Sequence, residues 1–226
     1  IFISMNKNDL KKNALDNIDK TNFFPSIGKN RIQGMIETRP DWCISRQRFW
    51  GVPLPIFIDS ETHEPIIDDE INSKIYEIFK KEGSDAWYKR SISDFIGEKY
   101  DPKKYKKVED IVEVWFDSGS SHTYVLENRD DLSWPADMYL EGSDQHRGWF
   151  HSSLLHSSGT RGKAPYKSIL THGFVVDGKG QKMSKSLGNV VAPDEIIKKN
   201  GADILRLWVV ASDYSEDLRI DQAIIA

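Results

Sequence analysis

The sequence lacks the residues that would build a disulfide or a thiolate metal site. Cys43 is the single cysteine among 226 residues, whereas a disulfide needs two and the usual structural zinc sites need more than one. No apolar run reaches the roughly 20 residues that a membrane helix requires, and no secretory signal opens the chain. These absences predict a cytoplasmic protein that has no contact with a membrane.

An excess of positive charge is also missing. The 31 Lys and Arg residues face 35 Asp and Glu residues, which gives a formal net charge of -4 at pH 7. Nonspecific nucleic-acid binding needs a basic surface that neutralises phosphates, so any contact with RNA must be local. Two basic segments are candidates: 103–107, which fits a solvated loop face better, and 46–48, for which both interpretations stay open. The hydrophobic content of 38% is enough for a core.

A lysine-rich loop is the most informative segment present. Residues 178–189 read Gly-Lys-Gly-Gln-Lys-Met-Ser-Lys-Ser-Leu-Gly-Asn, and Lys182 and Lys185 lie three positions apart between glycines. Glycine permits the backbone conformations that a close approach of an anion requires, so the loop can present ammonium groups to a polyphosphate. Basic, serine-rich turns are also common on solvated surfaces, so the loop alone does not decide between the two.

An acidic segment lies about forty residues upstream. Residues 138–150 read Met-Tyr-Leu-Glu-Gly-Ser-Asp-Gln-His-Arg-Gly-Trp-Phe. They predict a short strand, a polar turn, and a helix that begins at Gln145 and is capped by Ser143 or Asp144. Such a junction at the carboxyl edge of a parallel sheet can bind an anionic or hydroxyl-rich ligand. Because Glu141 and Asp144 would repel phosphate, we expect them to accept hydrogen bonds from a ribose hydroxyl or a substrate ammonium.

Trp149 is the aromatic residue of this segment with two possible roles. It follows Gln145 by four positions, so the two side chains would share one helix face. A tryptophan on a helix beside a sheet is more often part of the core than the wall of a ligand site. Core packing and a ligand-facing wall therefore both stay open.

The acidic segment, the segment Thr-His-Gly-Phe at 171–174 and the lysine-rich loop together resemble the second half of the catalytic domain of class I aminoacyl-tRNA synthetases. The resemblance covers about residues 35 to 222, and several motifs in the correct order are more specific than any one of them. The valyl and leucyl families share the lysine-rich loop, whereas the acidic segment resembles the isoleucyl family. Three further segments resemble the same class in the same order: 44–53, 114–122 and 201–208.

The resemblance implies a role for each matching residue. Glu141 would contact the amino group of the aminoacyl-adenylate, Trp149 would face the isoleucine side chain, and Lys185 would stabilise the transition state. The implied aminoacyl-adenylate residues are Glu141, Gly142, Asp144, Gln145 and Trp149; the implied ATP-binding residues are His172, Gly173, Lys182 and Lys185, of which the two lysines are catalytic. No metal ligand is implied, and the paired cysteines that bind zinc in some relatives are missing.

The implied reaction is attack of the isoleucine carboxylate on the α-phosphorus of ATP, assisted by Mg²⁺, followed by transfer of the aminoacyl group to tRNA(Ile). The implied partners are isoleucine, ATP and tRNA(Ile), and the complete enzyme would be a monomer. The His-Ile-Gly-His segment of the first catalytic half does not occur in the sequence, so we expect a fragment that is inactive alone. A valyl- or leucyl-type synthetase and a noncatalytic nucleotide- or RNA-binding module are the alternatives.

The predicted fold is α/β: the second half of a doubly wound, Rossmann-like parallel sheet with a small α+β inserted subdomain. The predicted segments are 1–52 (exit from an editing insertion), 53–107 (inserted subdomain), 108–200 (second catalytic half with the lysine-rich loop) and 201–226 (start of a helical connection). The predicted elements are a helix over 7–20 with breaks at Gly28 and Gly34, a helix over 71–82 ending near Gly83, strands over 111–116, 138–140 and 168–176, a helix from Pro193 to Gly201, and a helix capped by Asp203.

Overall fold

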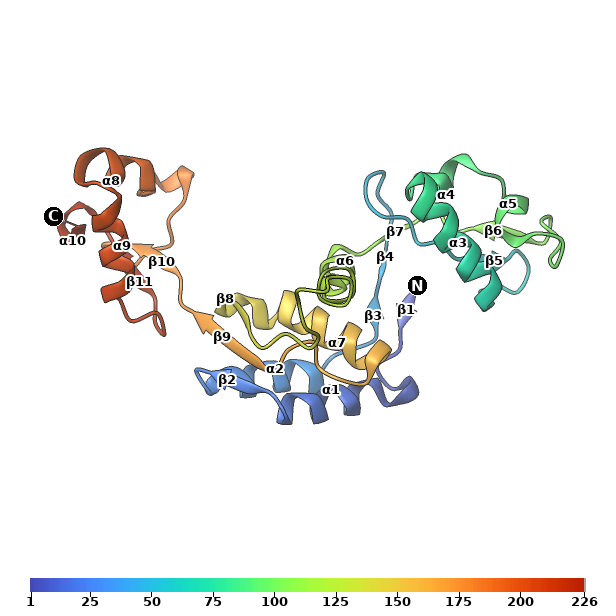
Figure 1. The fold of residues 1–226 in the computed structure, drawn as a ribbon, viewed down its shortest axis with the longest axis horizontal. Coiled ribbons are helices and arrows are strands. Elements are labelled where there is room, and N and C mark those ends of the chain that lie inside the picture. The colour runs from blue at the N-terminus through green and yellow to red at the C-terminus, as the bar shows by residue number, and fades with distance from the viewer. Residues whose placement is uncertain (226) are drawn as a thin grey trace. The chain divides into compact units, whose positions relative to one another are not determined.

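The computed structural model describes residues 1–225, which form two compact units (Figure 1). Unit 1 contains Ile1–Asn6 and Pro40–Ser118, and unit 2 contains Lys7–Arg39 and the chain from Gly119 onward. Within the described residues, no helix combines the length and the apolar character needed to cross a bilayer.

Unit 1 is built around a cluster of aromatic side chains. Trp87 is fully buried, and its ring centroid lies 4.8 Å from that of Phe57 and 5.2 Å from that of Phe95. The Nε1 atom of Trp87 donates to the carbonyl of Val108 at 2.9 Å, which satisfies the one polar atom of the ring. The strand pairs β1–β3, β4–β7 and β5–β6 are all antiparallel. The elements are β1 (Phe2–Ile3), β3 (Trp42–Cys43), β4 (Ser45–Arg46), β5 (Phe57–Asp59), α3 (Asp69–Glu82), α4 (Ala86–Lys89), α5 (Ile92–Ile96), β6 (Tyr105–Lys107), β7 (Ile111–Val112) and α6 (Val114–Gly119), which runs to the boundary.

Unit 2 contains a three-stranded sheet in the order β2–β9–β8, with both pairs parallel. Helix α1 packs against α2 and α7, as Figure 1 shows in blue and yellow. A second parallel pair, β10–β11, carries α8, α9 and α10, with Ile196, Ile220 and Ile225 buried between them. The elements are α1 (Leu10–Asp19), β2 (Asn22–Phe24), α2 (Ile27–Glu37), η2 (His122–Leu126), β8 (Tyr139–Gly142), η3 (Ser143–His146), α7 (Trp149–Arg161), β9 (Ser168–His172), β10 (Val175–Asp177), η4 (Lys185–Leu187), α8 (Pro193–Asn200), α9 (Ala202–Ala211), β11 (Leu218–Ile220) and α10 (Gln222–Ile225), with a short turn η1 (Lys7–Asp9) before α1.

Several predicted elements are confirmed where local signals specify them. The helix expected over 71–82 is α3, which begins after Asp68, whose side chain accepts from the backbone of Glu70 and Ile71, and ends at Gly83 with φ 80°. The helix from Pro193 is α8, and Gly201 follows its last residue. The α/β class with a parallel sheet is also confirmed. The roles predicted for segments 1–52, 53–107, 108–200 and 201–226 stay predictions.

The breaks expected at Gly28 and Gly34 are wrong, because both glycines lie inside α2. Each glycine costs about 1 kcal/mol relative to alanine in a helix. Ile32 and Ile36 on the same helix are completely buried, and burying such side chains contributes more than that cost. Packing of the apolar face therefore outweighs the low helix propensity.

The strands expected over 111–116 and 168–176 are each shorter than predicted. The first ends at Val112, and the β-branched and aromatic residues that follow it form α6; strand composition is overridden there by context. The second divides at Gly173 because the chain leaves its partners in the sheet and pairs with β11. Asp203 lies within the first turn of α9 and does not cap it; Gly201 occupies that position.

Candidate functional site

The acidic segment forms the end of β8, the 3₁₀ turn η3 and the start of α7. The helix expected from Gln145 begins at Trp149 instead. The Oε1 atom of Gln145 accepts from the backbone N–H of Trp149 at 2.9 Å, and its Nε2 atom donates to Oδ2 of Asp144 at 3.1 Å. Gln145 therefore satisfies the N–H of Trp149, the first residue of α7, and orients the Asp144 carboxylate.

Glu141 and Gly142 lie at the carboxyl end of β8, opposite Thr171 and His172 of β9. The Glu141 side chain is exposed, as is that of Asp144. A Cβ atom on Gly142 would lie 2.7 Å from Oδ1 of Asp144. A side chain at 142 would therefore displace the exposed Asp144 carboxylate from the strand end.

Trp149 uses one face of its ring for packing. The ring stacks on Tyr139 with centroids 4.0 Å apart and planes 4° from parallel, and Nε1 donates to Oγ of Ser121 at 3.0 Å. The side chain is half-buried. A stacked, half-buried ring is compatible with core packing and with a wall, so its ligand role stays a prediction.

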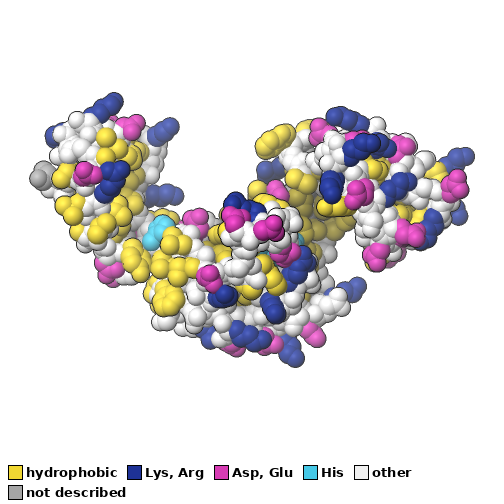
Figure 2. All heavy atoms as spheres, in the orientation of Figure 1, with side chains coloured by type: hydrophobic (Ala, Val, Ile, Leu, Met, Phe, Trp, Pro, Cys, Tyr) yellow, Lys and Arg dark blue, Asp and Glu magenta, His cyan; other side chains and the backbone are white. Residues whose placement is uncertain are grey.

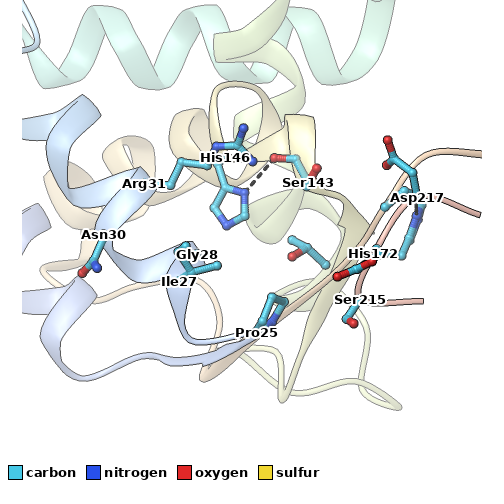
Figure 3. A pocket seen from close by; sticks show the side chains of 13 residues that line it. Pro25, Ile27, Gly28, Asn30, Arg31, Ser143, His146, His172, Ser215 and Asp217 are labelled. Atoms are coloured by element: carbon cyan, nitrogen blue, oxygen red, sulfur yellow. Dashed lines mark hydrogen bonds between the residues drawn. The ribbon is translucent and has the colours of Figure 1, made fainter. Parts of the chain in front are cut away.

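A cleft of about 610 Å³ lies beside the acidic turn (Figure 3). Its volume is within the usual range for a small-molecule site. Two of the residues predicted to bind ATP, His172 and Gly173, line it, whereas Glu141 and the two loop lysines are not part of its lining. Its other lining residues include Gly28, Arg31, Ser143, His146, Thr171 and Asp217.

Gly173 is held by backbone contacts that the sequence analysis did not find. Its N–H donates to the carbonyl of Tyr214 at 2.9 Å, and the next N–H, of Phe174, donates to Oδ1 of Asp217 at 2.7 Å. A Cβ atom on Gly173 would collide with the backbone of Glu216. Asp217 lies 43 positions after Phe174, so no local pattern could identify it as a partner.

The lysine-rich loop is held at its base by Asp177 and Asn189. Oδ1 of Asp177 accepts from the N–H groups of Lys179 and Gln181, and Oδ2 accepts from Nδ2 of Asn189 at 2.9 Å. Oδ1 of Asn189 accepts from the N–H of Ser184 at 2.9 Å. The hydrogen bond from Asn189, first among these contacts, lowers the pKa of Asp177, so the carboxylate is charged at neutral pH.

Lys182 and Lys185 are both exposed on this loop. Within residues 1–225, no hydrogen bond or ion pair engages their Nζ atoms. A loop that is fixed at its base and presents free ammonium groups can bind a polyphosphate. That these lysines face Glu141 across one ligand stays a prediction.

The surface around the site has mixed charge. Figure 2 shows Lys and Arg side chains interspersed with Asp and Glu over the visible face, and apolar side chains gathered near β2, β8 and β9. Phe24 and Leu140, from two of these strands, are each about half exposed, at 51% and 55%. On this face an anionic ligand would therefore depend on individual Lys and Arg side chains.

Comparison with known proteins connects this geometry to a family. The family described as "tRNA synthetases class I (I, L, M and V)" matches residues 1–221. The chain is 64% identical over 224 residues to an isoleucine–tRNA ligase of Pelagibacter ubique and 56% identical over 229 residues to that of Geobacter sulfurreducens. Each match covers 99% of the chain and 25% of the relative, so the chain spans about a quarter of their length.

Two solved structures share the fold. The methionyl-tRNA synthetase of Mycobacterium tuberculosis, in complex with methionyl-adenylate, matches with a TM-score of 0.59 and 21% identity over 98% of this chain and 35% of that one. The LeuRS of Agrobacterium radiobacter K84, in a ternary complex with tRNA and LeuAMS, matches with a TM-score of 0.56 and 23% identity over 82% of this chain and 26% of that one. At these identities the likeness establishes the fold alone.

Proposed function

Because this chain belongs to the class I tRNA synthetases, we propose that it is the second half of the catalytic domain of an isoleucine–tRNA ligase. The full-length protein would activate isoleucine with ATP and transfer it to tRNA(Ile). The observation that carries the proposal is 64% identity to an isoleucine–tRNA ligase over nearly the whole chain. The enzyme would act as a monomer in the cytoplasm.

The first step places charge on the phosphates of ATP as pyrophosphate leaves. Lys182 and Lys185, which are exposed and free at Nζ within the described chain, would bind these phosphates, and Lys185 would stabilise the transition state. Glu141 would accept from the ammonium group of isoleucine, and Asp144 from the ribose. Little covalent chemistry falls to the protein, so the rate depends on alignment and charge.

Mg²⁺ enters this proposal with the phosphates of ATP, whose charge it would neutralise. Within residues 1–225, no group of three or more His, Cys, Asp and Glu side chains is arranged to hold a metal ion. Mg²⁺ in nucleotide sites is commonly held by one or two carboxylates, water and substrate phosphates, so the ion would arrive bound to ATP.

The architecture supports a chain that is one part of a larger catalytic domain. Strand β8, which carries Glu141, lies at an edge of its sheet, so its outer side can pair with a strand from another part of the full-length protein. The ATP site would be completed by that part, so the fragment alone would not activate isoleucine.

Amino-acid-dependent exchange of labelled pyrophosphate into ATP, measured on the full-length protein, tests this function. We expect isoleucine to support exchange at a higher kcat/KM than valine or leucine. A preference for valine or leucine would assign the chain to a related synthetase. No exchange with any of the three would favour a noncatalytic nucleotide- or RNA-binding module.

Replacing Lys185 tests its proposed role. We expect Lys185→Ala in the full-length protein to lower the pyrophosphate exchange rate by about tenfold or more, because a charge aimed at the transition state is lost. The thermal midpoint should hardly change, because the side chain is exposed. Lys179→Ala, on the same loop and also exposed, is the matched control and should retain the rate. Equal rates for both variants would refute the assignment.

A further inference from the structure

His146 is a buried side chain that the proposed chemistry does not use. It is 2% exposed, at the end of η3, and its ring lies edge-on to Phe150 with centroids 5.7 Å apart. Its Nδ1 atom is 2.8 Å from the carbonyl oxygen of Ser143, the hydrogen bond drawn in Figure 3. A carbonyl oxygen can only accept, so Nδ1 must carry the proton.

The opposite nitrogen of the ring abuts helix α2. Burial lowers the pKa of His146, so the ring is neutral, and with the proton on Nδ1 its Nε2 atom carries a lone pair. Nε2 has no hydrogen-bond partner in the described chain. A Cβ atom on Gly28 would lie 2.6 Å from Nε2, so the ring rests against the bare backbone of this glycine.

The two glycines of α2 differ in this respect. Both have ordinary helical backbones, so neither is required by its conformation. A Cβ atom on Gly34 would meet nothing within 4 Å. Glycine is thus needed at position 28 for a steric reason: the rigid imidazole ring of His146 packs directly against the α2 backbone there.

We propose that Gly28 and His146 are positioning residues, which together set the backbone of the acidic turn for binding of the aminoacyl-adenylate. The ring contacts Gly28 of α2 on one side and the carbonyl of Ser143 on the other. Ser143 stands in the sequence between Gly142, which ends β8, and Asp144. The ring thereby connects the turn to α2, which also packs against β2 and η3. The choice of ligand rests on the proposed function.

Two amide variants of His146 separate positioning from simple packing. In His146→Asn the side-chain amide can place its N–H where Nδ1 stands, so the hydrogen bond to Ser143 can be retained. In His146→Gln the amide nitrogen reaches toward the place of Nε2, and the carbonyl of Ser143 loses its donor. Gly28→Ala moves the ring, and Gly34→Ala is the matched control on the same helix.

Titration calorimetry of the full-length protein with a nonhydrolysable isoleucyl-adenylate analogue provides two readouts. The stoichiometry counts competent sites, and Kd reports how well each site binds. We expect His146→Gln and Gly28→Ala to raise Kd by about tenfold, equivalent to about 1.4 kcal/mol, at unchanged stoichiometry. His146→Asn should raise Kd less than His146→Gln does, because it can keep the hydrogen bond to Ser143 and loses only the contact with Gly28. Gly34→Ala should keep Kd within about twofold of the parent value.

The alternative outcomes are distinct. A fall in stoichiometry at constant Kd in His146→Gln would show that the ring serves the fold alone, and would overturn the inference. So would equal Kd values for the Asn and Gln variants. If Gly28→Ala does not fold, the two His146 variants still decide. Failure of the parent protein to bind the analogue would instead refute the proposed function.

Discussion

His151 is a single residue whose environment predicts a pH dependence of stability. It is 4% exposed on α7, and neither ring nitrogen has a hydrogen-bond partner in the described chain. Burial, and then the charges of Arg39 and Arg147, lower its pKa to about 3. The unfolded chain, with a pKa near 6.5, therefore takes up the proton first as the pH falls.

The free energy of unfolding should accordingly be fully retained above pH 6.5 and decline as the pH falls toward 3. For His151 alone the loss between pH 7.5 and pH 5 is about 2 kcal/mol. We expect His151→Phe to reduce this decline, as measured by urea unfolding at pH 7.5 and pH 5. His63→Asn, at an exposed position with positive φ, is the control and should keep the full decline. An unchanged decline in His151→Phe would contradict the assignment.

The lysine-rich loop is an element held by few side chains, and Asn189 joins its two ends. Nδ2 of Asn189 donates to Asp177 and to the carbonyl of Lys182, while its Oδ1 atom accepts from Ser184. We expect Asn189→Ala to raise the rate of tryptic cleavage after Lys182 and Lys185 by about tenfold, because a lost hydrogen bond of this kind costs about 1 to 1.5 kcal/mol.

Gln181→Ala is the control for this change, because Gln181 lies on the same loop with an exposed side chain and contributes its backbone N–H to Asp177. It should be cleaved at the parent rate. Digestion followed by mass spectrometry identifies the cleaved bonds. Equal cleavage of both variants would mean that Asn189 does not hold the loop.

Considered as a whole, the molecule has two compact units with separate apolar clusters. Trp87 is the largest fully buried side chain of unit 1. We expect Trp87→Ala to destabilise that unit by about 3 to 5 kcal/mol, because it leaves a cavity among Phe57 and Phe95. Hydrogen exchange should increase in residues 53–107 and remain unchanged in α7 and β9.

Tyr88→Ala is the neighbouring control. Tyr88 is 51% exposed, so its removal should change stability by about 0.5 kcal/mol or less. Uniformly faster exchange in both units after Trp87→Ala would show that the units unfold together, contrary to the expectation from their separate clusters.

Features set by neighbouring residues could be predicted from the sequence. Helices α3 and α8 follow from capping residues, terminal glycines and apolar spacing within a dozen positions. The acidic segment and the lysine-rich loop were recognisable as motifs, and the class I synthetase family followed from their order, which the family match confirms. These signals are local because they depend on backbone hydrogen bonds and side-chain periodicity within single elements.

Contacts between distant segments decided the remaining features. Gly28 and Gly34 suggested breaks, yet α2 continues through them because Ile32 and Ile36 are buried. The strand divides at Gly173, where the chain leaves its partners in the sheet and the backbone of Glu216 lies close to it. The contact of the His146 ring with Gly28 joins residues more than a hundred positions apart. The energy of such contacts depends on which surfaces meet after folding, and no short sequence pattern encodes that.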